Sequence, residues 1–189
     1  MKKTLCAAAL AAALGWGAAA QADDGVIRIG FITDMSGLSA DADGPGGAEA
    51  IKMAIADFGG SVAGKKIEVL VADHQNRADI ASSRAREWLD QKGVNMLIAG
   101  ANSAAALAMA KVAEEKKTPF FVVSAGASEL TNSQCTPYTV HYVYDTVSLA
   151  RGTARAMLKE GNKDWFFLTV DHAFGQALER DASAVSYTH

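Results

Sequence analysis

Residues 97–128 constrain the fold more than any other stretch, because they read in order as strand, turn, helix and strand. An apolar run ends at Gly100, an alanine-rich helical stretch follows, and residues 119–123 form a second apolar run. Two strands joined by one helix require a right-handed crossover and parallel pairing. The turns that follow such strands share one edge of the sheet, where helix N-termini offer free N–H groups. We therefore expect residues 100–103 and 124–128 to form part of a pocket for a small anionic or zwitterionic molecule.

The same alternation of strands and helices extends toward the N-terminus. Apolar or alternating runs predict buried strands at residues 26–33, 67–72, 95–99 and 119–123. A helix is expected to begin at Pro45 and to bury Ile51, Ala54, Ile55 and Phe58. Asn76 is expected to be the N-cap of the next helix, with Asp79 in a capping-box position. The pattern predicts an α/β fold with a doubly wound parallel sheet.

The last part of the chain begins a second unit of the same kind. Residues 136–144 are expected to be irregular, and a helix is expected to follow and to end at Gly161. Residues 165–170 (WFFLTV) predict a strongly buried strand, with a further helix from Phe174. A lone strand and helix cannot bury both faces of the strand, so this piece is expected to start a second, incomplete lobe.

The first 22 residues have the features of a secretory signal peptide. Lys2 and Lys3 precede an apolar run, and a small-x-small cleavage site ends at Ala22. Without this leader the chain has 16 basic and 21 acidic side chains, a formal net charge of −5, which argues against binding to nucleic acid. Only Cys135 then remains as a cysteine, so a free thiol is expected, or a bond to a partner outside this chain.

The sequence offers little support for a nucleotide or metal site. About ten residues separate the glycines at 44–47 from the preceding strand, and the third glycine of a dinucleotide fingerprint is missing. The histidines show no metal-ligand spacing, although His74 and His172 both follow strands and are placed to face a cleft. No metal ion and no cofactor are therefore expected.

Catalysis by a serine is not favoured either. Ser103 lies in G-A-N-S-A, which is not a nucleophile elbow, and no sequence signal places a base beside Ser103, Ser124 or Ser128. A helix cap or a ligand hydrogen-bond donor needs no such activation. We therefore expect these serines to bind a ligand, and we expect the protein not to be an enzyme.

Six segments occur in an order and spacing that are specific when taken together. They read IRIGFITDMSG, VLVADHQN, LIAGANSAAALA, FFVVSAGASELT, VHYVYDT and WFFLTVDHAFGQALERD. With the leader, they resemble the type I periplasmic solute-binding proteins of ABC importers, in the branch that contains the leucine/isoleucine/valine-binding proteins. The resemblance covers residues 27–185. It implies two α/β lobes joined by a hinge, a small ligand between the lobes, and closure of the lobes around it.

The resemblance assigns ligand contacts to the two turns of the first lobe. Ser103, which follows Asn102, matches a serine that binds the carboxylate of an amino acid. Gly126 and Ser128, in the same turn as Ala125, match a pair that supplies a backbone carbonyl and a hydroxyl or N–H group. These five residues are the expected contacts on the first lobe.

Further contacts implied by the resemblance lie beyond the first lobe. Phe174 matches an aromatic side chain that covers the ligand from the second lobe, and Asp145 falls at the first crossover between the lobes. Asp145 also fits a helix cap, a partner for a ligand ammonium group, or a hinge support. The loop at residues 37–42 lacks the tyrosine that is frequent in the family, so an aromatic acid, an amide or urea fits as well as a branched-chain amino acid.

The resemblance implies a division into a signal peptide (1–22), a first ligand-binding lobe (23–143), and a crossover with an incomplete second lobe (144–189). It implies that the protein captures a small amino-acid-like or carboxylate solute in the periplasm and docks on an ABC permease in the inner membrane. A full-length protein of this kind is expected to be a monomer. Two alternatives remain open: a periplasmic sensor domain with the same binding fold, and an exported nucleotide-dependent α/β enzyme domain.

Overall fold

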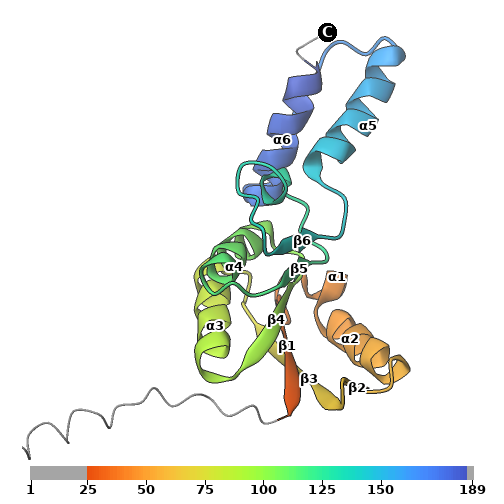
Figure 1. Cartoon of the computed structure of the whole chain (residues 1–189). Coiled ribbons are helices and arrows are strands. Elements are labelled where there is room, and N and C mark those ends of the chain that lie inside the picture. Colours follow the sequence, from red (N-terminus) through yellow and green to blue (C-terminus); the bar gives the residue numbers. More distant parts are fainter. Residues whose placement is uncertain (1–24, 187–189) are drawn as a thin grey trace, which may run out of the picture.

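A computed structural model describes residues 25–186, and the expected leader at residues 1–22 lies outside this range. A six-stranded sheet in the order β2-β3-β1-β4-β5-β6 forms the centre of the fold (Figure 1). The strands are β1 (Val26–Thr33), β2 (Ser61–Val62), β3 (Lys65–Asp73), β4 (Val94–Ala99), β5 (Phe120–Val122) and β6 (Thr139–His141).

Strand β1 lies inside the sheet and pairs in parallel on both sides. Ile29 is opposite Val69 of β3 on one side and opposite Met96 of β4 on the other. All other pairs of strands are also parallel except β2 and β3, which form a short antiparallel hairpin that the sequence analysis did not predict. The predicted α/β fold with a doubly wound parallel sheet is confirmed.

Helices cover both faces of the sheet (Figure 1). Helix α2 (Pro45–Asp57) lies on one face, after the short helix α1 (Ala40–Asp43), and α3 (Ala78–Gln91) and α4 (Ser103–Glu115) lie on the other. The larger core cluster lies on the α3 and α4 side, where Trp88, Leu97 and Phe120 are buried together. The alanine faces of α3 and α4 allow these two helices to pack closely against each other and against the strands.

Predictions for two of the helices are wrong in part. Ala54 and Phe58 were expected in the core but both are exposed. Ala54 lies on the outer face of α2, and Phe58 is 65% exposed because α2 ends at Asp57 and the chain turns away through Gly59 and Gly60, both with positive φ. Asn76 is not the N-cap of α3. The N-cap is Arg77, and Asn76 itself has a left-handed φ of 58°.

Helices α5 (Thr146–Lys159) and α6 (Ala173–Ser186) lie side by side and project away from the sheet (Figure 1). A 3-10 turn, η1 (Ser128–Leu130), lies near the base of this pair. No helix within residues 25–186 is long and apolar enough to cross a membrane.

The buried strand predicted at residues 165–170 is not formed. This segment runs extended along α5 and α6, but no other strand in the described part of the chain pairs with it. Alternate side chains face the two helices, while Phe166 is 92% and Leu168 96% exposed on the other side. The sequence pattern gave the extended backbone correctly, but a strand also needs a neighbour for its hydrogen bonds.

The core cluster generates a prediction about stability. Replacing Leu97 with alanine should lower the free energy of unfolding by about 2–5 kcal/mol, because Leu97 is fully buried among close-packed side chains. Met53→Ala, at a position on α2 that is 60% exposed, should change it by about 0.5 kcal/mol or less. Urea unfolding followed by circular dichroism measures both. Equal losses in the two variants would contradict this description of the core.

Candidate ligand-binding site

A cleft of about 490 Å³ opens at the carboxyl-terminal edge of the sheet and reaches the start of α6. One wall comes from the loops after β1, β3, β4 and β5, and the other from the residues that begin α6. Its lining consists of small, polar and aromatic residues: Leu38, Ser39, Ala42, Asn76, Ala101, Asn102, Ser103, Ala104, Ser124, Tyr144, Asp171, His172, Ala173 and Phe174.

A buried carboxylate fixes the shape of the loop after β1. Asp34 is fully buried and accepts hydrogen bonds from the N–H groups of Gly37 (2.8 Å) and Ser39 (2.9 Å). A Cβ atom at position 37 would lie 2.7 Å from the Asp34 carboxylate, so only glycine fits there. This arrangement places Leu38 and Ser39 at the mouth of the cleft.

Asp73, at the end of β3, ties this loop to the next one. Its carboxylate accepts hydrogen bonds from the N–H groups of Met35 (3.0 Å) and Gln75 (2.7 Å) and from the Ser36 hydroxyl (2.6 Å). Burial by itself would raise the pKa of Asp73, but the Ser36, Met35 and Gln75 hydrogen bonds outweigh it and lower the pKa. The loops after β1 and β3 are therefore held together as one unit.

The start of α4 faces the cleft, as the sequence predicted. Asn102 is the N-cap, and its side-chain oxygen accepts a hydrogen bond from the Ala105 N–H (2.8 Å). Ser103 is 3% exposed, and its hydroxyl oxygen accepts a hydrogen bond from the Ala127 N–H (3.3 Å). No acceptor in the described part of the chain takes the N–H groups of Ser103 and Ala104, so both are free to bind a ligand.

The turn after β5 lies behind the aromatic part of the cleft. A Cβ atom at Gly126 would lie 3.0 Å from the rings of both Tyr144 and Phe174, so glycine allows these rings to approach the turn. The Gly126 carbonyl accepts a hydrogen bond from the Thr146 N–H (2.9 Å), and the Ala125 carbonyl is 2.7 Å from His141 Nε2. Neither Ala125 nor Gly126 lines the cleft.

Ser128 also lies outside the cleft, in a buried network that joins η1 to α5 and α6. The hydroxyls of Ser128 and Thr146 both donate to Asp181 Oδ2, at 2.8 and 2.6 Å. Arg180 donates to the Ser128 hydroxyl (2.9 Å) and pairs with Glu129. Burial by itself would raise the pKa of Asp181, but the hydrogen bonds from Thr146, Ser128 and Arg180 outweigh it and lower the pKa.

Asp145 caps α5 rather than lining the cleft. Its carboxylate accepts a hydrogen bond from the Ser148 N–H (2.7 Å), and the Asp145 N–H donates to the Ser148 hydroxyl oxygen (3.3 Å). This is a complete capping box. Of the seven predicted site residues, the structure thus brings Asn102, Ser103 and Phe174 together. Ligand contacts by Ala125, Gly126, Ser128 and Asp145 stay predictions.

Several lining residues were not among the predicted site residues. His172 lies at the start of α6 with its ring 6.4 Å from that of Phe174, at an interplanar angle of 41°. Tyr144 and Asn76 come from loops whose positions follow only from the folded sheet. The sequence analysis did place His172 to face a cleft, because it follows the extended segment as His74 follows β3, but it did not count His172 among the ligand contacts. His74, in contrast, is buried beneath the loops rather than facing the cleft.

The lining of the cleft is suited to binding rather than to catalysis. It contains no lysine or arginine, and its one acidic residue is Asp171. The partner of the Ser103 hydroxyl is a backbone N–H group, which cannot remove its proton. No group of three or more metal-ligating side chains occurs within residues 25–186. The free N–H groups at the start of α4 favour an anion, and the rings favour a flat or apolar body.

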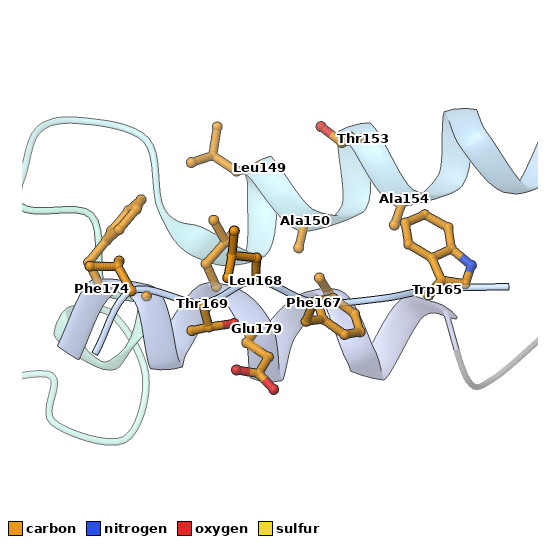
Figure 2. A pocket seen from close by; sticks show the side chains of 14 residues that line it. Leu149, Ala150, Thr153, Ala154, Trp165, Phe167, Leu168, Thr169, Phe174 and Glu179 are labelled. Carbon is orange, nitrogen blue, oxygen red and sulfur yellow. The ribbon is translucent and has the colours of Figure 1, made fainter. Parts of the chain in front are cut away.

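A second hollow, of about 470 Å³, lies between α5, α6 and residues 165–170 (Figure 2). Figure 2 shows Trp165 and Phe167 between the two helices, with Ala150 and Ala154 of α5 pointing toward them. Almost all of its lining is apolar, and Glu179 is its single charged side chain. This hollow lacks convergent polar groups, so it is a weaker candidate than the cleft.

The family model described as periplasmic binding protein matches residues 26–186. A comparison with curated proteins finds no significant match.

Solved structures similar to the chain include three binding proteins. A periplasmic binding protein from Burkholderia mallei is 62% identical, with a TM-score of 0.84 over 86% of this chain and 44% of that one. A branched chain amino acid ABC transporter periplasmic ligand-binding protein from Burkholderia xenovorans is 34% identical (TM-score 0.72; 85% and 44% covered). A solute binding protein of an ABC transporter from Rhodopseudomonas palustris, in complex with 3,4-dihydroxybenzoic acid, is 29% identical (TM-score 0.77; 87% and 45% covered). The chain therefore spans less than half the length of each.

The burial of His74 generates a prediction about pH. Loss of hydration on burial lowers the pKa of His74, although Asp34, Asp73 and Asp43 act in the opposite direction. As pH falls below about 6.5, His74 is therefore protonated in the unfolded state before it is protonated in the folded state. Over this range the free energy of unfolding should fall by up to about 1.4 kcal/mol per pH unit, until the pKa of His74 in the folded state is passed.

His74→Asn keeps an acceptor for the Asn76 N–H and should show a shallower dependence between pH 7 and pH 5. His172→Asn serves as the control, because its side chain is exposed to water in the folded state too. Urea midpoints measured at several pH values give the slopes. Identical slopes in wild type and His74→Asn would contradict the prediction.

The network around Asp181 generates a third prediction. Asp181→Ala leaves the Ser128 and Thr146 hydroxyls without their common acceptor, so the free energy of unfolding should fall by about 1–3 kcal/mol. Asp57→Ala, at the exposed end of α2, should change it by about 0.5 kcal/mol or less. Chemical denaturation at pH 7 compares the two variants. A loss no larger for Asp181→Ala than for Asp57→Ala would show that the network does not stabilise the fold.

Proposed function

This chain belongs to the periplasmic binding protein family of ABC transporters, in its leucine-binding-protein-like branch, and we propose that it captures a small carboxylate solute in the cleft. The solute is an amino-acid-like molecule or another small organic acid. One observation carries the proposal: the starts of α4 and α6 both reach the same cleft, and no basic side chain lines it. A carboxylate is then held by backbone N–H groups and hydroxyls rather than by an ion pair.

The charges and sizes in the cleft support this ligand class. Ser103 and Ala104 offer N–H groups at the positive end of α4, and the Ser103 hydroxyl hydrogen has no acceptor within the described residues. Tyr144 and Phe174 provide ring surface a short distance away. The cleft of about 490 Å³ suits a molecule of the size of an amino acid or a substituted benzoate.

Two relatives support the same class. The Rhodopseudomonas palustris protein is described in complex with 3,4-dihydroxybenzoic acid. The Burkholderia xenovorans protein is described as a branched chain amino acid ABC transporter periplasmic ligand-binding protein. Both kinds of molecule carry a carboxylate beside an apolar or aromatic body. The lining of this cleft accommodates either kind.

The mechanism that we propose is closure of two lobes around the solute, with no chemical step. In this mechanism we assign residues 23–143 to the first lobe. Residues from 144 onward are assigned to the second lobe, because Asp171 to Phe174 lie in the opposite wall of the cleft. Helix α5 begins where the chain leaves the sheet, so rotation at its capped N-terminus would move α6 against α4. The closed form would then dock on an ABC permease after export of the chain and removal of its leader after Ala22.

The proposal is tested by a ligand screen with a matched pair of variants. L-Leucine, L-valine, benzoate, 4-hydroxybenzoate and 3,4-dihydroxybenzoate are added to the protein, and those that bind should raise Tm. Ser103→Ala removes a hydrogen bond to a charged group and should weaken binding about ten-fold or more in isothermal titration. Ser83→Ala, on an exposed face of α3, should bind like the wild type.

Two outcomes would overturn the proposal. If no carboxylate raises Tm and a neutral or cationic solute does, the ligand class is wrong. If a carboxylate binds equally well to wild type and Ser103→Ala, the ligand does not bind at the start of α4.

A further inference from the structure

The side chain of Asn76 contacts the cap of α4, and the contact has a defined direction. The Ala105 N–H can only donate, so the Asn102 side-chain atom that faces it, at 2.8 Å, is the oxygen. The amide nitrogen of Asn102 then points to the loop after β3. There it donates to the Asn76 side-chain oxygen, and the Asn76 main-chain oxygen lies 3.4 Å from the same nitrogen.

The backbone of the loop after β3 is shaped for this contact. Gln75 and Asn76 both have left-handed φ values, 52° and 58°, which residues other than glycine rarely adopt. Asparagine tolerates this conformation better than most residues. The buried ring of His74 supports the turn, because its Nδ1 accepts the Asn76 N–H at 3.0 Å. The turn directs both oxygens of Asn76 toward the start of α4.

Asn76 has no other role in the structure that would explain this conformation. It does not cap α3, whose N-cap is Arg77. It lies on the surface of the cleft and is exposed, so its contact with Asn102 contributes little to the stability of the fold. What the contact does determine is the orientation of the Asn102 amide.

We propose that Asn76 is a positioning residue for the binding end of α4. By holding the Asn102 amide nitrogen, it keeps the Asn102 oxygen on Ala105 and leaves the N–H groups of Ser103 and Ala104 directed into the cleft. If Asn76 is removed, the Asn102 amide rotates, and its oxygen competes with the ligand for those N–H groups. This inference rests on the proposed function, because it assumes that an anionic ligand binds at this end of α4.

Three variants separate the side chain of Asn76 from its backbone. Asn76→Gly keeps the left-handed turn but removes the acceptor. Asn76→Asp keeps an acceptor oxygen for the Asn102 amide nitrogen and should therefore keep the Asn102 oxygen on the Ala105 N–H. Gln75→Gly is the matched control at the neighbouring left-handed position. There the backbone N–H of Gln75, and not its side chain, donates the hydrogen bond to Asp73.

The first measurement needs no ligand. Amide hydrogen exchange at Ala105, followed by NMR, should be about five-fold faster in Asn76→Gly than in the wild type, because the cap is released part of the time. Asn76→Asp and Gln75→Gly should exchange at the wild-type rate. Unchanged exchange at Ala105 in Asn76→Gly would overturn the inference.

The second measurement is isothermal titration with L-leucine and with 4-hydroxybenzoate. Asn76→Gly should weaken the binding of whichever compound binds the wild type by about three- to ten-fold. Gln75→Gly should bind within about two-fold of the wild type, whereas Asn76→Asp is compared only by hydrogen exchange, because its carboxylate would repel an anionic ligand in the cleft. Wild-type affinity in Asn76→Gly would overturn the positioning role and leave the proposed function standing. Failure of both compounds to bind the wild type counts against the proposed function, and the exchange rate of Ala105 then decides the positioning of the cap.

Discussion

The pairing of β1 on both sides in a parallel sheet is the constraint on which the rest of the structure depends. A strand with parallel neighbours on either side cannot be connected to them by tight hairpins, so each connection crosses over through a helix. The loops after β1, β3 and β4 are therefore brought to one edge of the sheet, although β3 ends at Asp73 and β4 ends only at Ala99. The cleft exists because of this topology, and the residues in the loops determine only what the cleft can bind.

Short polar side chains, rather than packing, hold the loops at that edge. Asp34 and Asp73 bind backbone N–H groups in the loop after β1, while Asn102 and Asn76 join the next two loops. Each tie uses a group that water could also satisfy, so the energy gained per contact is small. The benefit lies in binding: N–H groups and hydroxyls that are already fixed lose no conformational entropy when a ligand binds. On the opposite wall, the Asp181 network fixes where α6 begins its path away from the sheet.

The sequence predicted the sheet, its helices and the two turns at the cleft, because apolar periodicity reports directly on burial. It was less informative where one side chain can make more than one kind of contact. Asn76 fits an N-cap by sequence, yet its left-handed backbone gives it a different partner, Asn102 in the neighbouring loop of the same wall. For Ser128, the sequence could not reveal that its hydroxyl donates to Asp181, more than fifty residues away, and its contact with a ligand stays a prediction. Tyr144 reaches the cleft only because Gly126 leaves room for its ring, and no periodic pattern could reveal that.

Residues 165–170 have a consequence for the solution behaviour of the chain. The segment WFFLTV contains no charge and no proline, and within residues 25–186 neither of its backbone edges is paired with a strand. Phe166 and Leu168 are presented to solvent in the alternation that lets identical segments stack. Any chain in which this segment stays uncovered carries an aggregation-prone sequence at its surface, and its solubility then depends on concentration and on chaperones.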